Sequence, residues 1–236
     1  MSDTKYAYAV ARIRALENGL FSSAQIEQLL SVKSYEGALR FLTEHGWGNA
    51  DTPLSAEAIL TREKTKTWET VRDLLKGDDA ILAVLSYGDL YHNLKAAIKD
   101  AAAPGSHGNV YFDDCEVDGV RMAKIVAEKD WQALPAHMRE AAKEASETFL
   151  HTGDGQLCDI IVDRAALAAI YECGKNASDA IIRDYAETTV AVADIKIAVR
   201  SQKTGKHLDF MRRAMTPCDS LNIERLSQAA LGGAGA

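Results

Sequence analysis

Proline is scarce in this sequence, with 4 residues in 236, and no stretch alternates between apolar and polar residues for long enough to require a sheet. Alanine, leucine, glutamate and lysine, which favour helices, are abundant instead. Hydrophobic residues make up 47% of the chain, which is enough to bury a core as one large or two small units. The sequence therefore predicts an all-α protein.

Basic residues are outnumbered, with 27 Lys and Arg against 34 Asp and Glu, and no basic run is longer than Arg212-Arg213. A nucleic-acid-binding protein usually carries a basic face, so this class is disfavoured. Long apolar runs are also missing, since Ala165 to Tyr171 falls far short of the roughly 20 residues that span a bilayer. Met1 to Lys5 lead directly into an amphipathic helix, so we expect no signal peptide and a cytoplasmic location.

Cysteine is limited to four residues, which form neither a close pair nor a regular spacing: Cys115, Cys158, Cys173 and Cys218. This pattern is typical of reduced thiols that fill a core. The sequence also lacks a Gly-x-Ser-x-Gly elbow, a phosphate-binding Gly-x-x-x-x-Gly-Lys-Ser/Thr loop, a His-Glu-x-x-His motif and Glu-x-x-His pairs. We therefore expect no catalytic residue, no cofactor and no metal site.

One polar cluster keeps a catalytic alternative open, namely His151, Asp154, Asp159, Asp163 and Arg164. Asp159 and Asp163 are four residues apart on one helical face, where they could bind a hard cation or share a proton in a helical-bundle enzyme. The structural interpretation is favoured. Asp154 would cap a helix, the two other acids would lie in its early turns, and Arg164 would be a local counter-charge.

The most prominent element is a long helix from about Ser178 to Gln202. Its large apolar residues recur every three or four positions and predict one stripe that packs against other helices: Ile181, Ile182, Tyr185, Thr189, Val192, Ile195 and Val199. The helix ends in the segment Asp194 to Arg200.

The segment Asn93 to Lys99, 101 residues upstream, matches Asp194 to Arg200 type for type, and Arg12 and Arg14 form a weaker third copy. A period of this length is typical of a duplicated helical subdomain. The bases Lys95, Lys99, Lys196 and Arg200 either extend along the bundle surface or pair with acids of neighbouring helices such as Asp159 and Asp163. In both cases their role is architectural.

Capping residues divide the first part of the chain into helices. Ser22 to Gln25 form a capping box, and Ser34 and Ser55 precede two further helices. Gly88, inside a helix from about Asp79 to Ala103, suggests a close helix crossing. The stretch 106–119, which contains Ser, Asn, two Gly and three Asp, predicts a hinge between a first subdomain, 1–105, and a second subdomain with the start of a third, 120–231, followed by a flexible tail, 232–236.

Several segments together resemble the C subunit of bacterial and archaeal V-type (A/V-type) ATPases, which is the counterpart of the d subunit of the eukaryotic V-ATPase. They are Tyr6 to Glu17, Ile26 to Leu30, Asp89 to Lys99, Asp159 to Ala165 and Asp194 to Arg200. None of them is a catalytic fingerprint, but their order and spacing cover nearly the whole chain.

The resemblance implies a funnel-like array of similar helical subdomains without catalytic activity. It implies a connector between the D and F subunits of the central stalk and the proteolipid rotor ring of a rotary motor. Such a protein couples ATP hydrolysis or synthesis to H⁺ or Na⁺ transport, and it would lie in the cytoplasm on the membrane face of the ring. The rival from another class is a generic cytosolic helical adaptor.

The chain departs from the family pattern in two places. It spans two of the three subdomains, and Pro217-Cys218-Asp219 stands where the family has a pair of glycines. Without a third subdomain we expect an exposed apolar stripe at Tyr6, Val10 and Ile13. A second copy of the chain could cover that stripe, so self-association is a further expectation.

Overall fold

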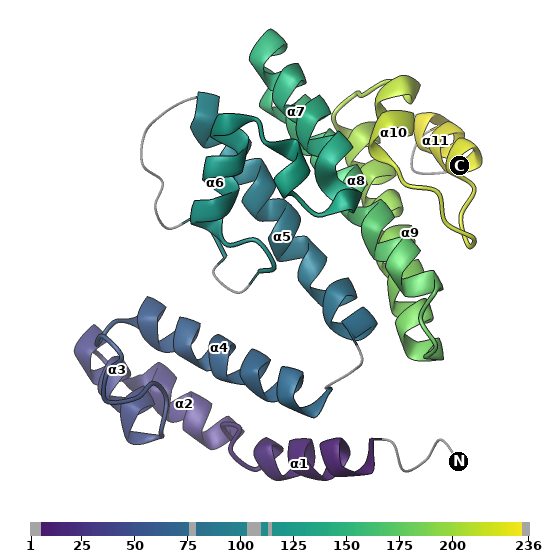
Figure 1. The fold of residues 1–236 in the computed structure, drawn as a ribbon. Coiled ribbons are helices and arrows are strands. Elements are labelled where there is room, and N and C mark those ends of the chain that lie inside the picture. Colours follow the sequence, from purple (N-terminus) through teal and green to yellow (C-terminus); the bar gives the residue numbers. More distant parts are fainter. Residues whose placement is uncertain (1–5, 76–78, 103–109, 113–114, 233–236) are drawn as a thin grey trace. The chain divides into compact units, whose positions relative to one another are not determined.

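The computed structural model describes residues 6–75, 79–102, 110–112 and 115–232 (Figure 1). Within these ranges the secondary structure is helical and contains no strand, so the predicted all-α class is confirmed. The chain divides into two compact units, Met1–Asp79 and Ala80–Ala236. No helix in the described ranges is long and apolar enough to cross a membrane.

The first unit contains α1 (Ala7–Glu17), α2 (Ser23–Ser31), α3 (Tyr35–Glu44) and α4 (Ala56–Leu74). The capping predictions for three of these helices are confirmed. Ser22 and Gln25 form the reciprocal capping box of α2, while the side chains of Ser34 and Ser55 accept backbone N–H groups at the starts of α3 and α4. The residues predicted to cap α1, Ser2 and Asp3, lie outside the described residues.

The core of the first unit is small and partly aromatic. Leu39, Leu42 and Ile59 are buried, and Phe21 and Trp47 pack against them. The rings of Phe21 and Trp47 are stacked with their centroids 5.2 Å apart. These contacts hold α3 against α4.

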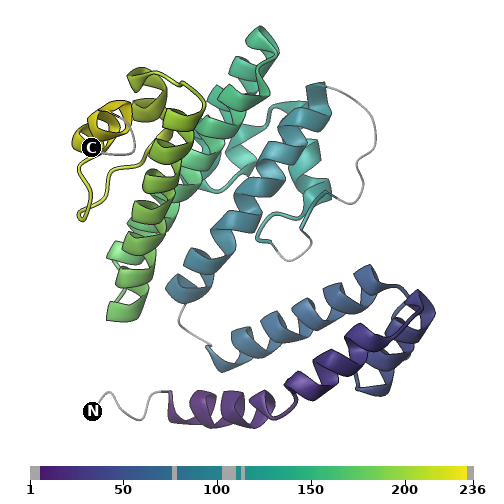
Figure 2. The same cartoon turned by 180° about the vertical axis from the view of Figure 1, so that it is seen from behind.

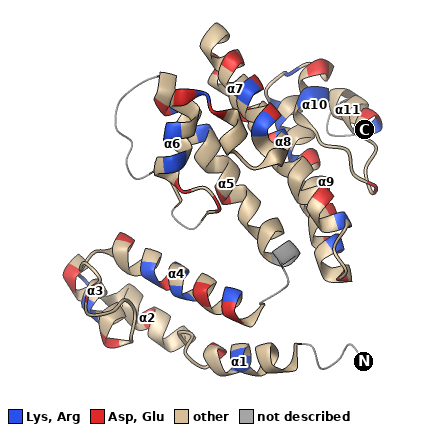
Figure 3. Cartoon of the chain, viewed as in Figure 1, with Lys and Arg blue, Asp and Glu red and all other residues tan. Residues whose placement is uncertain are grey.

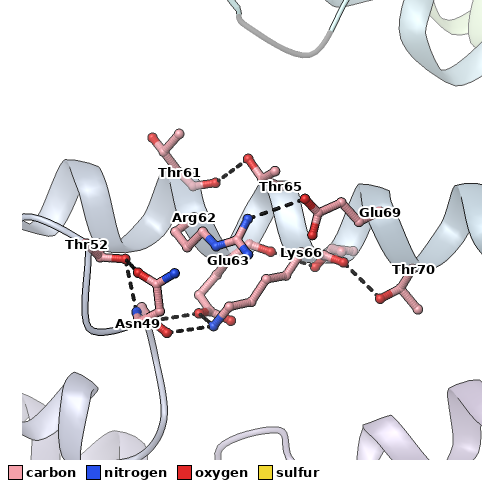
Figure 4. Close-up of polar contacts among 11 residues, drawn as sticks. Asn49, Thr52, Thr61, Arg62, Glu63, Thr65, Lys66, Glu69 and Thr70 are labelled. Atoms are coloured by element: carbon pink, nitrogen blue, oxygen red, sulfur yellow. Dashed lines mark hydrogen bonds and ion pairs between the residues drawn. The ribbon is translucent and has the colours of Figure 1, made fainter.

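A loop after α3 is fixed to α4 by a polar network. Gly46 and Gly48 adopt positive φ angles of 84° and 78°, which favour glycine. Glu63 Oε1 accepts the Gly48 N–H at 2.8 Å, and Lys66 Nζ donates to the Gly48 carbonyl at 2.8 Å and to Glu63 at 2.6 Å (Figure 4). Both backbone polar groups of Gly48 are thus satisfied by side chains of α4.

The second unit contains helices of 7 to 24 residues and two short 3₁₀ turns, Trp131–Ala133 and Ala136–Met138. Its helices are α5 (Asp79–Ala102), α6 (Gly119–Glu128), α7 (Arg139–Thr152), α8 (Gly155–Lys175), α9 (Ala180–Lys203), α10 (Leu208–Ala214) and α11 (Ile223–Gly232). α8 and α9 lie side by side, and α10 and α11 pack near the C-terminal half of α9 (Figures 1 and 2).

The main core of this unit lies where α5 meets α6, α7 and α8. Leu90, Leu94, Met122, Met138 and Val162 are at most 1% exposed within it. A smaller cluster joins Val84 of α5 to apolar residues of α8 and α9. α5 therefore contributes to both apolar clusters.

The predicted close helix crossing occurs at another glycine. Gly88 is exposed and a Cβ there would meet no atom within 4 Å. At Gly174 of α8 a Cβ would overlap the Cβ of Ala186 in α9. The small residue that lets two helices approach closely is thus Gly174, and the expectation for Gly88 was wrong.

The packing face predicted for α9 was mostly wrong, although Ile182 of that stripe is buried. Ile181, Tyr185, Val192, Ile195 and Val199 are 41–74% exposed. Apart from Ile182, the buried face consists of smaller or polar residues: Ala186, Val190, Asp194, Ala198 and Ser201. The prediction failed because it followed residue size, whereas α8 approaches α9 closely at small residues.

The subdomain boundaries predicted from the sequence stay a prediction. The segment 106–119 falls within the second compact unit, and residues 103–109 and 113–114 lie outside the described part of the chain.

Candidate functional site

Asn93 of α5 is fully buried and binds a loop through both polar atoms of its amide. Its Nδ2 donates to the Phe112 carbonyl at 2.8 Å, and its Oδ1 accepts the Phe112 N–H at 2.8 Å. Because both backbone groups of Phe112 are satisfied, the chain segment before α6 is fixed on the surface of α5.

Asp194 occupies the same position in α9, and it is also fully buried. Its Oδ1 accepts the Thr216 N–H at 3.1 Å, whereas its Oδ2 is buried without a hydrogen-bond partner. Burial raises the pKa of Asp194 from 3.8 to about 6, and the hydrogen bond from Thr216 opposes this rise.

The two contacts are equivalent in their positions along the chain. Phe112 lies seven residues before α6 begins, and Thr216 lies seven residues before α11 begins. Each of these helices has an Asp or Asn cap, because Asp118 accepts the N–H of Arg121 and Asn222 that of Arg225, both at 2.9 Å. The repeat seen in the sequence is thus a structural repeat: a buried polar residue in a long helix holds the loop that leads to the next short helix.

The structure brings four of the predicted residues together between α5 and α8. Lys95 Nζ lies 2.6 Å from Asp163 Oδ1, and Lys99 Nζ lies 2.7 Å from Asp159 Oδ1. All four side chains are at least 23% exposed, so we expect each pair to stabilise the fold by less than about 1 kcal/mol. Their effect is mainly to set the register of α5 against α8.

The equivalent bases of α9 are not paired in this way. Lys196 and Arg200 are exposed, and no acid of the described residues forms an ion pair with either. The side chain of Arg164 is exposed as well, while its backbone carbonyl accepts the Thr216 hydroxyl at 3.2 Å. Of the two alternatives drawn from the sequence, the first copy therefore shows the ion pairs, whereas Lys196 and Arg200 of the second copy are exposed and form no ion pair with a described acid.

The weak third copy lies in α1, on the other compact unit. Arg12 is exposed, and Arg14 pairs with Glu17 at 2.8 Å within the same helix. Val10 and Ile13 are 54% and 44% exposed, as expected for an uncovered stripe, whereas Tyr6 is half-buried.

The carboxylate cluster does not assemble into a metal site. Asp154 caps α8 by accepting the N–H groups of Gln156 and Leu157, and the two other acids contact Lys95 and Lys99. His151 is exposed in the last turn of α7. Among the described residues, no three His, Cys, Asp or Glu side chains are placed to hold a metal ion.

Charged residues of both signs are interspersed along the helices of each unit (Figure 3). The hydrogen bonds and ion pairs described above join helices to one another or to loops. Each residue predicted from the sequence either takes part in such a contact or remains exposed. The family model that describes the ATP synthase (C/AC39) subunit matches residues 9–233. The chain belongs to this family.

The family match confirms the resemblance drawn from the sequence, and it makes the chain a component of a V/A-type ATPase. A search of curated proteins gave no match. Sequence reasoning missed the two buried contacts to Phe112 and Thr216. The available signal was the pairing of Asn93 with Asp194, a short polar residue at one position of both copies.

Proposed function

We propose that this ATP synthase (C/AC39) subunit is a non-catalytic connector in the central stalk of a rotary ATPase. It joins the shaft, which the D and F subunits form, to the proteolipid ring in the membrane. The protein would lie on the cytoplasmic face of the membrane, attached through the ring. The observation that carries this proposal is the family match over residues 9–233.

The chemistry of the polar residues supports a mechanical role. The buried Asn93 and Asp194 hold loops, and Lys95 and Lys99 link two long helices through Asp163 and Asp159. A protein that transmits torque needs rigid helices whose register is fixed at several points. The subdomain array proposed from the sequence, 1–105 and 120–231 with the start of a third subdomain, provides such helices.

A binding measurement tests the proposal. The full chain is immobilised and exposed to the purified D–F complex and, separately, to the detergent-solubilised proteolipid ring of the same organism. An A–B head without D and F is the control. We expect binding to D–F and to the ring but not to the control. Binding to neither D–F nor the ring would refute the connector role.

A further inference from the structure

One face of α9 exposes large apolar side chains together with two bases. Tyr185, Val192, Ile195 and Val199 are 41–47% exposed, and Lys196 and Arg200 lie among them. A shallow groove of about 430 Å³ follows this face over Tyr185, Thr188, Thr189, Val192, Ala193 and Lys196. We call this surface, Tyr185 to Arg200, the α9 face. An exposed apolar row of this kind is typical of an interaction site.

The same positions in α5 are fully covered. Counting back 101 residues, Tyr185, Val192, Ile195 and Val199 correspond to residues that are at most 2% exposed: Val84, Tyr91, Leu94 and Ile98. These residues of α5 pack against α6, α7, α8 and α9. The opposite side matches too, because Ala97 and Ala198 are both buried. The α9 face therefore has the residue pattern of a helix-packing surface, and no described helix of the second unit covers it.

The charges show what kind of helix would fit. In α5 the bases at the corresponding positions, Lys95 and Lys99, contact Asp163 and Asp159 of α8. α8 presents these acids beside small apolar residues, in the pairs Cys158-Asp159 and Val162-Asp163, four residues apart. Cys158 and Val162 are fully buried. Lys196 and Arg200 are spaced as Lys95 and Lys99 are, so they fit two carboxylates of the same spacing.

We propose that the α9 face binds an amphipathic helix of another polypeptide. This helix carries two carboxylates four residues apart beside small apolar side chains, which is the pattern of α8. The proposal rests on the comparison of α5 with α9 and does not depend on the proposed function.

A second copy of the chain fits the α9 face less well. Its own α8 cannot supply the acids, because they already contact Lys95 and Lys99 within that copy. The exposed apolar stripe of α1 carries Arg12 and Arg14, so it would place bases against Lys196 and Arg200. Like charges across an interface disfavour binding.

A peptide-binding experiment with charge reversal tests this inference. The probe is a helix-stapled, fluorescent peptide copy of residues 154–172 that carries Cys158→Ala, and its anisotropy is followed as the full chain is added. The test variant is Lys196→Glu/Arg200→Glu. A control with the same change in charge elsewhere is Lys33→Glu/Lys143→Glu. All four substituted side chains are exposed, so circular dichroism and urea unfolding should match the parent chain.

We expect the peptide to bind the parent chain and the control equally, and the test variant at least tenfold more weakly. A second peptide with Asp159→Lys and Asp163→Lys should bind the test variant better than the parent chain. Absence of binding, or equal binding to the parent chain and the test variant, would overturn the inference. So would a dimer of the parent chain that Lys196→Glu/Arg200→Glu dissociates, because a second copy would then occupy the face.

Discussion

Asp194→Asn is expected to stabilise the protein above pH 6. In α5, Asn93 both donates to and accepts from the backbone of Phe112. In α9, Asp194 accepts one N–H from Thr216 and leaves Oδ2 buried without a partner. Burying an ionised carboxylate costs free energy, whereas a neutral amide of the same shape avoids the cost of burying a charge. The substitution gives α9 the side chain that α5 already uses.

The magnitude follows from the pKa of Asp194. Burial raises this pKa from 3.8 to about 6, a difference of roughly two units, and each unit corresponds to about 1.4 kcal/mol. Because the folded state holds the proton more tightly than the unfolded state, the contribution of Asp194 to stability is greatest below about pH 4. It is lost as the pH rises through 6, and the loss is about 3 kcal/mol in all.

Urea unfolding followed by circular dichroism between pH 4.5 and 8 measures this difference. We expect the free energy of unfolding of Asp194→Asn to be about 1–3 kcal/mol higher than that of the parent chain at pH 8. This difference should become smaller toward pH 4.5. The mirror substitution, Asn93→Asp, should destabilise the protein most at pH 8. A gap that does not change with pH, or a less stable Asp194→Asn variant at pH 8, would refute the reasoning.

Three further substitutions test the packing. A double-mutant cycle of Lys95→Met and Asp163→Asn should give a coupling free energy below about 1 kcal/mol in urea unfolding, because both side chains are partly exposed. A coupling free energy above about 2 kcal/mol would contradict this. Gly174→Ala should lower the free energy of unfolding by about 1–3 kcal/mol, because the new methyl group would overlap Ala186. An unchanged urea midpoint would show that α8 and α9 do not cross so closely. Ser22→Ala should cost about 1 kcal/mol and speed amide hydrogen exchange in α2; protection equal to the parent chain would argue against the capping box.

The helix boundaries were the most predictable part of the fold. A cap is a local interaction, so the Ser22–Gln25 box and the caps Ser34 and Ser55 could be recognised from a few neighbouring residues. The glycines that end helices have the same property, as Gly153 shows with its φ of 65°.

The packing of α9 could not be predicted in the same way. Large apolar residues at helical spacing predicted a buried stripe, yet Val192, Ile195 and Val199 are exposed and the small Ala186 and Ala198 are buried. Helical periodicity shows that a face is apolar but not whether a partner covers it. The choice of face depends on long-range contacts, here the approach of α8 at Gly174.

The polar contacts were predicted only in part. The repeat suggested that Lys95 and Lys99 contact acids such as Asp159 and Asp163, and the structure places them together. For Lys196 and Arg200 the repeat left two alternatives, an ion pair or extension along the surface, and no acid in the described residues pairs with them. The buried contacts of Asn93 and Asp194 depend on loops 19 and 22 residues away, which local sequence patterns do not reveal.

Attachment of the shaft to the ring is the role proposed for this protein, and co-sedimentation measures it most directly. An ATP-hydrolysing A–B–D–F head is mixed with vesicles that contain the proteolipid ring, with and without the chain. We expect the head to sediment with the vesicles only when the chain is present, while its rate of ATP hydrolysis in solution is unchanged by the chain. Attachment that is equal with and without the chain would contradict the connector role.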